Sequence, residues 1–197
     1  MRTQAEKAAA FRALHERDGA FIIPNPWDKG TARLLAYLGF GALATTSAGY
    51  AFSVGKRDYS IGRDEMMEHV RDIVSATNLP VNADLENGFG DDAETIAETF
   101  RLAAAAGLVG GSIEDATSRP GEPIYEQERA AERVRAAAAV TRALPFPFTL
   151  TGRAENYLWS RPDLKDTIKR LQAYQEAGVG RALRAGTHKQ GRHRRGG

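Results

Sequence analysis

The sequence predicts an α/β fold in which short buried strands alternate with helices and pair in parallel. Helical segments end in Gly39, Gly107 and Gly178, and each is followed by a linker and a strand-like run. Glycine just past a helix supplies the left-handed residue that closes it. Pro80 and Pro145 mark two further junctions of the same kind. A repeat of roughly 35 residues is typical of strand–helix units, which place their strands in one parallel sheet with right-handed crossovers.

Five short runs are expected to form the strands. Each is largely apolar and ends in polar residues, as expected for a strand that is buried on both faces and reaches solvent only at its end. In chain order they are Phe21–Pro24, Ala42–Thr46, Val81–Asp84, Gly111–Glu114 and Phe148–Thr151.

Apolar residues at helical spacing predict four helices that follow these strands. Asp28 is the expected N-cap of the first of them, and Ser160, with Pro162 in the first turn, is expected to open the last. The predicted apolar faces are Ala32, Leu35 and Leu38; Met66, Val70, Ile73 and Val74; Ile96, Phe100 and Ala103; and Leu164, Ile168 and Leu171.

Such a chain can close as an eight-unit barrel or remain an open, doubly wound sheet. Doubly wound sheets that bind dinucleotides carry a glycine-rich phosphate-binding turn after the first strand. Here that place is occupied by the sequence NPWDKG, from Asn25 to Gly30. The missing fingerprint favours the barrel.

The composition predicts a single globular domain located in the cytoplasm. The chain has 197 residues, of which 42% are hydrophobic and 26% charged, enough for a sizeable core. It has no cysteine, which excludes disulfides, thiolate metal sites and a cysteine nucleophile. No run approaches the ~20 apolar residues of a membrane helix, and the N-terminus lacks a signal-peptide core. We therefore expect no membrane partner.

The positive charge is concentrated at the C-terminus. The formal net charge is +2, but six of the 27 Lys and Arg residues lie in 181–197, which contain no Asp or Glu. Residues 1–180 therefore carry 21 basic against 25 acidic side chains. A basic tail can bind nucleic acid, but a second origin, given below, is preferred, and a nucleic-acid partner is not expected.

Acidic residues follow two successive predicted strands. Asp84 and Glu86 end the third strand, and Glu114 ends the fourth. In a barrel these ends share one mouth, where acids from neighbouring strands can converge on a hard divalent cation. Either acid alone could instead cap a helix or pair with a buried arginine. None of the four histidines follows a predicted strand, so an oxygen-ligated Mg²⁺ or Mn²⁺ is favoured over a zinc site or a Ser-His-Asp triad.

Other polar residues at the strand ends could bind an anionic substrate. Arg153 offers a fork of donors that matches a carboxylate or phosphonate, although a structural ion pair is equally compatible with it. Ser47 with the N–H groups of Ala48 and Gly49 could hold a second oxyanion, although by itself it is better explained as a turn residue. Trp27 is either a packing residue or a substrate platform.

Five blocks of the sequence resemble the isocitrate lyase/phosphoenolpyruvate mutase superfamily in order and spacing. They are IIPNPWDKGTARLLAYLGFGALATTSAG, PVNADLENGFGDD, GGSIEDAT, GEPIY and TGRAEN. The resemblance implies a (β/α)₈ barrel of the TIM type that binds Mg²⁺ and acts on small 2-oxo or 2-hydroxy acids. Such enzymes make or break a C–C or P–C bond through an enolate-like species. It also implies that full-length relatives form homo-oligomers.

The resemblance assigns roles to the acidic residues. Asp84 is similar to the direct metal ligand, and Asp58, Glu86 and Glu114 are similar to the acids that hold the metal through water. By itself Asp58 would be taken for a solvated charge in a long polar loop. A metal on the substrate's oxygens would act as a Lewis acid for the developing enolate charge.

The resemblance also assigns the substrate clamp. Ser47 with the amides of Ala48 and Gly49, together with Arg153, is similar to the clamp on a pyruvyl carboxylate, and Trp27 lies in the first matching block. Fixed donors of this kind stabilise developing charge without reorganising. Asp58, Glu114 and Arg153 are accordingly the expected catalytic residues.

Two departures from the family pattern narrow the expected chemistry. The family's lyases have a gating loop with a catalytic cysteine, whereas the equivalent stretch here, Ala116–Glu128, has none. This argues against true isocitrate or methylisocitrate lyase chemistry and leaves phosphonopyruvate mutases or hydrolases and oxaloacetate-decarboxylase-like members. Glu86 also stands where aspartate is common. A citrate-lyase-type aldolase barrel is a third interpretation, and the TTSAG and TGRAEN blocks count against it.

The end of the chain also departs from the family pattern. Relatives continue with a strand close to ADxLYAPG, and permitted codons for residue 181 onward, read one nucleotide later, give ALYAPG. We therefore expect 1–180 to be a partial catalytic barrel of about five to six βα units out of eight, and 181–197 to be a frameshifted or disordered tail. Activity is then expected to be impaired. The alternative is a non-catalytic barrel fragment whose tail binds nucleic acid or an acidic partner.

Overall fold

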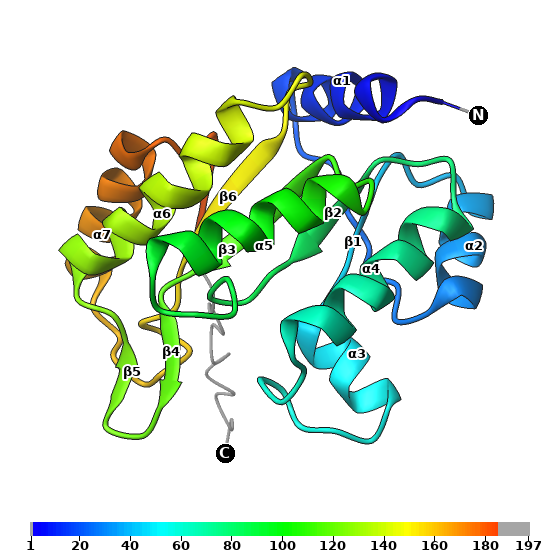
Figure 1. The fold of residues 1–197 in the computed structure, drawn as a ribbon. Coiled ribbons are helices and arrows are strands. Elements are labelled where there is room, and N and C mark those ends of the chain that lie inside the picture. The colour runs from blue at the N-terminus through cyan, green and yellow to red at the C-terminus, as the bar shows by residue number, and fades with distance from the viewer. Residues whose placement is uncertain (1, 185–197) are drawn as a thin grey trace, which may run out of the picture.

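The structure, a computed structural model, describes residues 2–184 as an arc of parallel strands with helices along its outer face (Figure 1). The sheet order is β1-β2-β3-β6-β7, all parallel. The strands are β1 (Leu43–Ala44), β2 (Val81–Asp84), β3 (Gly110–Glu114), β6 (Thr149–Ala154) and β7 (Arg181–Arg184). This is the α/β fold predicted from the sequence, and it forms part of a (β/α)₈ barrel.

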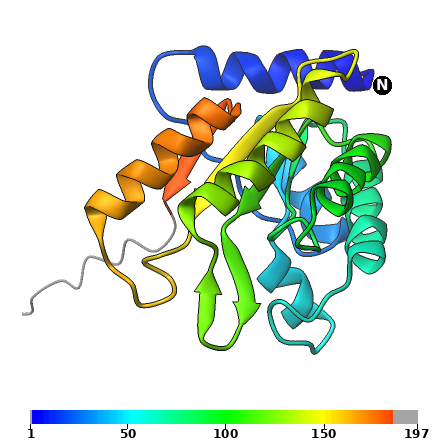
Figure 2. The ribbon, with the colours of Figure 1, turned by 60° about the vertical axis from the view of Figure 1, so that its left-hand side comes forward.

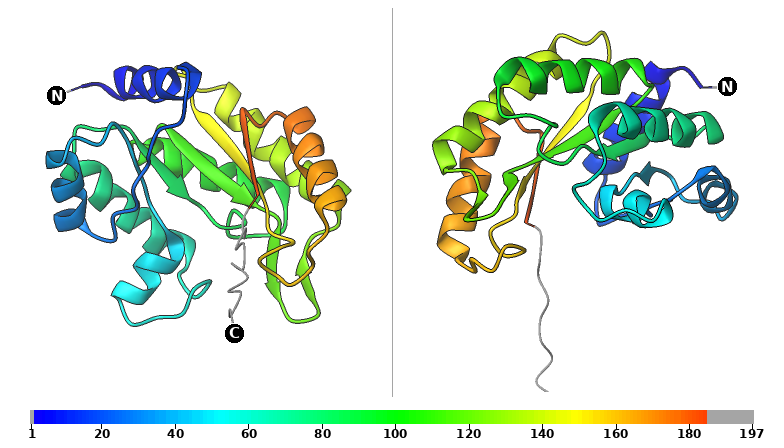
Figure 3. Two further views of the ribbon diagram at one scale, coloured as in Figure 1. Left: turned by 180° about the vertical axis from the view of Figure 1, so that it is seen from behind. Right: turned by 60° about the horizontal axis from the view of Figure 1, so that its bottom comes forward.

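Helices connect the strands and pack against one another in chain order. They are α1 (Gln4–Glu16), α2 (Lys29–Tyr37), α3 (Ser47–Ser53), α4 (Arg63–Ala76), α5 (Ala93–Ala105), α6 (Gln127–Arg142) and α7 (Leu164–Ala177). Contacts run from α2 to α4, then to α5, α6 and α7. Viewed from behind, the other face of the sheet is turned toward the viewer and α1 crosses its amino-terminal end (Figure 3). No helix within residues 2–184 is long and apolar enough to span a bilayer.

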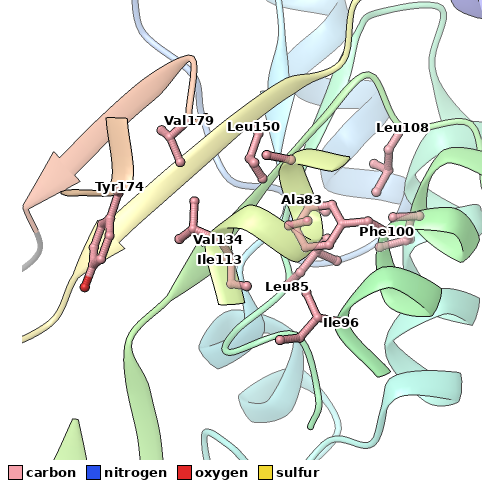
Figure 4. Packing of buried hydrophobic residues seen from close by; sticks show 14 of the residues in the cluster. Ala83, Leu85, Ile96, Phe100, Leu108, Ile113, Val134, Leu150, Tyr174 and Val179 are labelled. Carbon is pink, nitrogen blue, oxygen red and sulfur yellow. The ribbon is translucent and has the colours of Figure 1, made fainter. Parts of the chain in front are cut away.

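The hydrophobic core lies between the sheet and the outer helices (Figure 4). Ile96 and Phe100 of α5 are fully buried, as are Leu85 after β2 and Leu108 before β3. The predicted apolar faces of α4 and α5 are confirmed: Met66, Val70, Ile73, Ile96, Phe100 and Ala103 are buried, and Val74 is partly buried against the core.

Local capping signals are also confirmed. Asp28 is the N-cap of α2, and its side chain accepts a hydrogen bond from the Thr31 amide at 2.7 Å. Gly39, Gly107 and Gly178 have φ values of 86°, 96° and 116°, a region that glycine enters without the steric cost of a Cβ.

The predicted first strand, Phe21–Pro24, is not a regular strand. The segment runs beside β1 with a backbone hydrogen bond from the Ala44 amide to the Pro24 carbonyl at 3.1 Å. Pro24 and Pro26 have no N–H group to donate, so this stretch is poorly suited to a continuous ladder.

The last helix starts later and buries a different face than predicted. Its N-cap is Asp163, whose side chain accepts from two amides, whereas Ser160 lies outside the helix with φ 58°. Leu164 and Ile168 are about half exposed, and Leu38 of α2 is also exposed. The buried face of α7 is Thr167, Arg170, Tyr174 and Ala177. Arg170 and Tyr174 point inward because both bind the buried Asp115.

Two segments that looked like loops contain regular structure. Ser47, which by itself is better explained as a turn residue, opens the helix α3. The stretch equivalent to the gating loop forms the antiparallel hairpin of β4 (Ala116–Arg119) and β5 (Glu122–Ile124), which projects beyond the sheet (Figure 2). The expected tail begins with four residues that form β7 beside β6. The rest of that expectation, 185–197, lies outside the described residues.

Candidate active site

The predicted site residues gather at the carboxyl ends of the strands. Asp84 ends β2, Glu114 ends β3 and Arg153 lies near the end of β6. The parallel register pairs Asp84 with Ser112 and Glu114 with Arg153. Ser47 opens α3, directly after the first strand. The strand order therefore brings residues up to 106 positions apart into one cluster.

Asp84 is the hub of this cluster. Its Oδ2 accepts hydrogen bonds from the Ser47 hydroxyl at 2.9 Å and the Ser47 amide at 3.2 Å. Its Oδ1 accepts from Arg153 Nη1 at 3.1 Å and from the Glu86 amide at 3.3 Å. The carboxylate is thus fixed in orientation by donors from three segments.

Arg153 brings the two predicted metal-binding strand ends together. Its Nη1 lies 3.1 Å from Asp84 Oδ1 and 3.3 Å from Glu114 Oε2. The two carboxyl groups therefore point toward one another across a single nitrogen atom. Burial raises the pKa of Glu114 to about 8, although the charge of Arg153 works in the opposite direction.

Asp58 and Glu86 complete the acidic rim. Asp58 Oδ1 lies 3.4 Å from the Ser47 hydroxyl and accepts from the Tyr59 amide at 3.0 Å. Burial is the main cause that raises the pKa of Asp58. Glu86 is 5% exposed, has a positive φ of 47°, and its Oε1 has no hydrogen-bond partner among the described residues. Burial raises its pKa to about 8, and the charges of Asp84 and Asp58 add to the effect.

Two further residues of the site were not predicted from the sequence. The Tyr59 hydroxyl donates to Glu114 Oε1 at 2.5 Å, and its ring centre lies 6.0 Å from that of Trp159. Glu155 is fully buried, and its Oε1 lies 2.9 Å from Arg153 Nε. Glu155 could have been singled out because it lies in the TGRAEN block, two residues after Arg153.

Asp115 stands next to Glu114 but belongs to the scaffold. Its Oδ2 accepts from Tyr174 at 2.6 Å and from Arg170 at 3.0 Å, and its Oδ1 accepts from the Glu155 amide at 2.8 Å. All of these hydrogen bonds are buried. Asp115 therefore links the end of β3 to β6 and α7, on the side of the strand away from the cavity.

The proposed oxyanion amides are only partly free. The Gly49 amide already donates to Thr46 Oγ1 at 3.2 Å as part of the α3 cap. Trp27 is 46% exposed and lies against Gly49, since a Cβ at that position would be 2.4 Å from the indole Nε1. The contact with Gly49 shows that Trp27 packs at the start of α3.

Adding a methyl group at Gly49 is expected to disturb this corner. The Gly49→Ala variant should lose about 1–3 kcal/mol of unfolding free energy, because Trp27 and Thr46 must both move. Urea unfolding followed by tryptophan fluorescence measures the loss. Gly41→Ala is the matched control, since a Cβ at Gly41 makes only ordinary contacts with Leu14, at 3.4 and 3.5 Å. Equal stability of the two variants would contradict the prediction.

A cavity of about 510 Å³ opens beside the cluster on the inner face of the sheet. Asp84 and Arg153 line it, together with polar side chains that point inward from neighbouring strands. Those residues are Thr45, Asn82, Ser112 and Thr151. The cavity offers space for a small polar molecule in contact with both charged groups.

The side chains fit a hard cation that is held mainly through water. Three acids, Asp84, Glu114 and Glu155, pair with Arg153, and Glu86 presents a buried oxygen with no partner among the described residues. Within residues 2–184, no three Asp, Glu or His side chains are close enough to bind one ion directly. Carboxylate oxygens are the ligands that Mg²⁺ prefers, and Mg²⁺ usually keeps several waters. The acids of this cluster thus offer the kind of ligand atom that Mg²⁺ prefers.

Comparisons with known proteins agree with the sequence blocks. The profile of the phosphoenolpyruvate phosphomutase family matches residues 11–191. The chain is 30% identical to 2-methylisocitrate lyase of Escherichia coli over 178 residues, covering 86% of this chain and 59% of the enzyme. An uncharacterized protein of Mycobacterium tuberculosis is also 30% identical, with 86% of this chain and 62% of that protein covered.

Solved structures give the same assignment. A candidate lyase/mutase from Burkholderia cenocepacia has 65% identity and a TM-score of 0.90, covering 92% of this chain and 65% of that one. A candidate phosphonomutase from the same organism has 33% identity and a TM-score of 0.85, covering 92% and 74%. This chain spans less than two thirds of the length of the first of them and of both curated relatives. The chain belongs to the phosphoenolpyruvate phosphomutase family, within the isocitrate lyase/phosphoenolpyruvate mutase superfamily.

Proposed function

We propose that this chain carries the metal and substrate site of an Mg²⁺-dependent lyase or mutase of small 2-oxo or 2-hydroxy acids. The observation that supports it most is the placement of Asp84 and Glu114 against the same nitrogen of Arg153, with Ser47 bound to Asp84. Asp84 and Arg153 thus line one cavity, and Glu114 pairs with the same arginine.

In this proposal the acids hold the metal ion. Asp84 is the direct ligand, and Asp58, Glu86 and Glu114 bind through water. A bound Mg²⁺, or Mn²⁺ in its place, would polarise the substrate's oxygens as a Lewis acid and favour enolate formation. The raised pKa values of Glu86 and Glu114 agree with this role, because both carboxylates are buried in a site that lacks enough positive charge of its own.

The remaining residues orient the substrate. Arg153 binds a carboxylate or phosphonate group, and Ser47 with the adjacent amides approaches a second oxygen. The amide of Gly49 already caps α3, and the hydroxyl and amide of Ser47 both donate to Asp84, so the Ala48 amide is the better candidate for this contact. Asp58, at 3.4 Å from the Ser47 hydroxyl, can hold or accept a proton at the same point. Tyr59 holds Glu114 in place by its hydrogen bond.

Named relatives support a small-acid substrate. Those above 25% identity include 2-methylisocitrate lyases and 2,3-dimethylmalate lyase of Eubacterium barkeri. A solved oxaloacetate acetylhydrolase, 25% identical, contains its product oxalate. The chain lacks the cysteine of the lyases' gating loop and has a β-hairpin in that place. We therefore favour oxaloacetate or phosphonopyruvate over isocitrate or methylisocitrate.

A substrate panel tests the proposal. Oxaloacetate, phosphonopyruvate, methylisocitrate and 2,3-dimethylmalate should be incubated with the protein in Mg²⁺, in Mn²⁺ and in EDTA, and acid consumption followed by ¹H and ³¹P NMR. We expect turnover of one of the first two that stops in EDTA and returns with added Mg²⁺. Salt-sensitive DNA binding that is lost on deleting residues 181–197, with no turnover, would favour the non-catalytic alternative.

A further inference from the structure

Glu155 is a buried carboxylate with one partner. It is fully buried, its Oε1 forms an ion pair with Arg153 Nε at 2.9 Å, and neither of its oxygens accepts a hydrogen bond from a described residue. Burying a carboxylate costs several kcal/mol, and a single ion pair often fails to offset that cost. Its position therefore calls for a reason other than stability.

Charge balance alone does not supply that reason. The guanidinium of Arg153 already faces two carboxylates, those of Asp84 and Glu114, both at Nη1. Glu155 adds a third negative charge to one positive charge, and it approaches a different edge of the group, at Nε. Contacts at two edges of a planar group fix its rotation as well as its location. Arg153 Nη2 donates no hydrogen bond to a side chain that the structure describes.

The backbone of Glu155 is fixed by buried hydrogen bonds that lead to α7. Its amide donates to Asp115 Oδ1 at 2.8 Å, and Asp115 is bound by Arg170 and Tyr174 of α7. The next residue, Asn156, is fully buried and donates to Thr167 Oγ1 at 2.8 Å. The segment after Arg153 is thus anchored to the helix layer rather than to the cavity.

We propose that Glu155 is a positioning residue that fixes the plane of the Arg153 guanidinium and leaves Nη2 for a substrate carboxylate. This rests on the proposed function as far as the substrate is concerned. A metal ion bound to Asp84 would compete with Arg153 for the Asp84 carboxylate. Glu155 is fully buried, so the metal ion would not compete with Arg153 for the Glu155 carboxylate. Glu155 would therefore keep the Arg153 guanidinium in place when the contacts of Arg153 with Asp84 and Glu114 change.

The first test measures the mobility of Arg153 directly and needs no substrate. The ¹⁵N relaxation of arginine Nε–Hε groups gives the order parameter of each side chain, with the Arg153 signal identified by its loss in Arg153→Lys. We expect an order parameter near that of rigid backbone, about 0.85, in the wild-type protein and a clear fall toward 0.6 in Glu155→Gln. A wild-type value as low as that of exposed arginines overturns the proposal, even if the variant does not fold.

The second test measures ligand binding. Calorimetric titration of oxalate in the presence of Mg²⁺ should show about tenfold or greater weakening in Glu155→Gln, the lower end of the effect of supporting residues. Thr167→Val is the matched control, because Thr167 is buried, anchors the same segment and does not touch Arg153. It should lose stability but keep the Arg153 order parameter and oxalate affinity.

The two tests separate the two proposals. If the wild-type protein does not bind oxalate but Arg153 is rigid and loosens only in Glu155→Gln, the positioning role stands and the proposed function fails. If oxalate binds with equal affinity to the wild type and Glu155→Gln, and Arg153 stays rigid in both, the positioning role fails and the proposed function stands.

Discussion

Replacing Asp84 with alanine is expected to lower Mg²⁺-dependent turnover by about 10³-fold or more. The change removes the proposed direct ligand, and with it the acceptor for Ser47 and one acceptor for Arg153. Loss of a single well-placed charge-stabilising group already costs about 10²–10³ in rate, and here the metal would be lost as well. Initial rates on the best substrate of the panel, over a range of Mg²⁺ concentrations, measure the effect.

Asp64→Ala is the matched control for Asp84→Ala. Asp64 is an aspartate in the first turn of α4, and its side chain is 94% exposed. Its replacement should leave the rate within a factor of two and the Mg²⁺ dependence unchanged. Turnover in Asp84→Ala that matches this control, at any Mg²⁺ concentration, would remove the metal site from the proposal.

The largest effect on stability is expected from completing the sheet. β1 and β7 are its outer strands in the described residues, and the large side chains of Tyr37 on α2 and of Leu164 and Ile168 on α7 are exposed. Unpaired edges and apolar patches favour aggregation, and closure into a barrel removes them. We expect the 197-residue chain by itself to be poorly soluble and weakly active.

A chimera tests this expectation. Residues 1–180 would be joined to the C-terminal third of the Burkholderia cenocepacia relative, which is 65% identical over the matched region. Burial of only ~200 Å² of apolar surface contributes about 5 kcal/mol, equivalent to about 10–20 °C in Tm for a chain of this size. Calorimetry and light scattering compare the chimera with the 197-residue chain.

A polar double variant of the 197-residue chain separates the two causes. Leu164→Asn with Ile168→Asn should reduce aggregation without raising Tm or activity, because it removes an apolar patch but pairs no strand. A 197-residue chain that is monomeric, melts cooperatively at the chimera's Tm and turns over substrate at the same rate would show that the open sheet is not a defect.

Features that depend on neighbouring residues could be predicted from the sequence. Asp28 caps α2, and Gly178 closes α7, because both signals act within one turn of a helix. The proximity of Asp84 and Glu114, which both approach Arg153 Nη1, also follows from sequence, since the ends of neighbouring parallel strands must share an edge. Their assignment as metal ligands stays a prediction.

Features that depend on distant partners could not be predicted. The apolar pattern of α7 pointed Leu164 and Ile168 inward, but the helix is rotated so that Arg170 and Tyr174 reach Asp115, 55 and 59 residues earlier. The sequence does not single out Tyr59, because its hydrogen bond to Glu114 depends on how the loop that contains Tyr59 folds against the end of β3. In both cases the tertiary fold determines which residues bind a buried carboxylate, and the spacing of apolar residues along the sequence does not reveal these contacts.

Two adjacent acids at the end of β3 point in opposite directions and bind different partners. Glu114 faces Arg153 and the cavity, and Asp115 faces α7, because successive side chains on a strand leave by opposite faces. Inserting or deleting one residue in β3 would therefore exchange their directions, turning the acid that binds α7 toward Arg153 and the acid that binds Arg153 toward α7. We therefore expect this segment to tolerate replacements better than changes in its length.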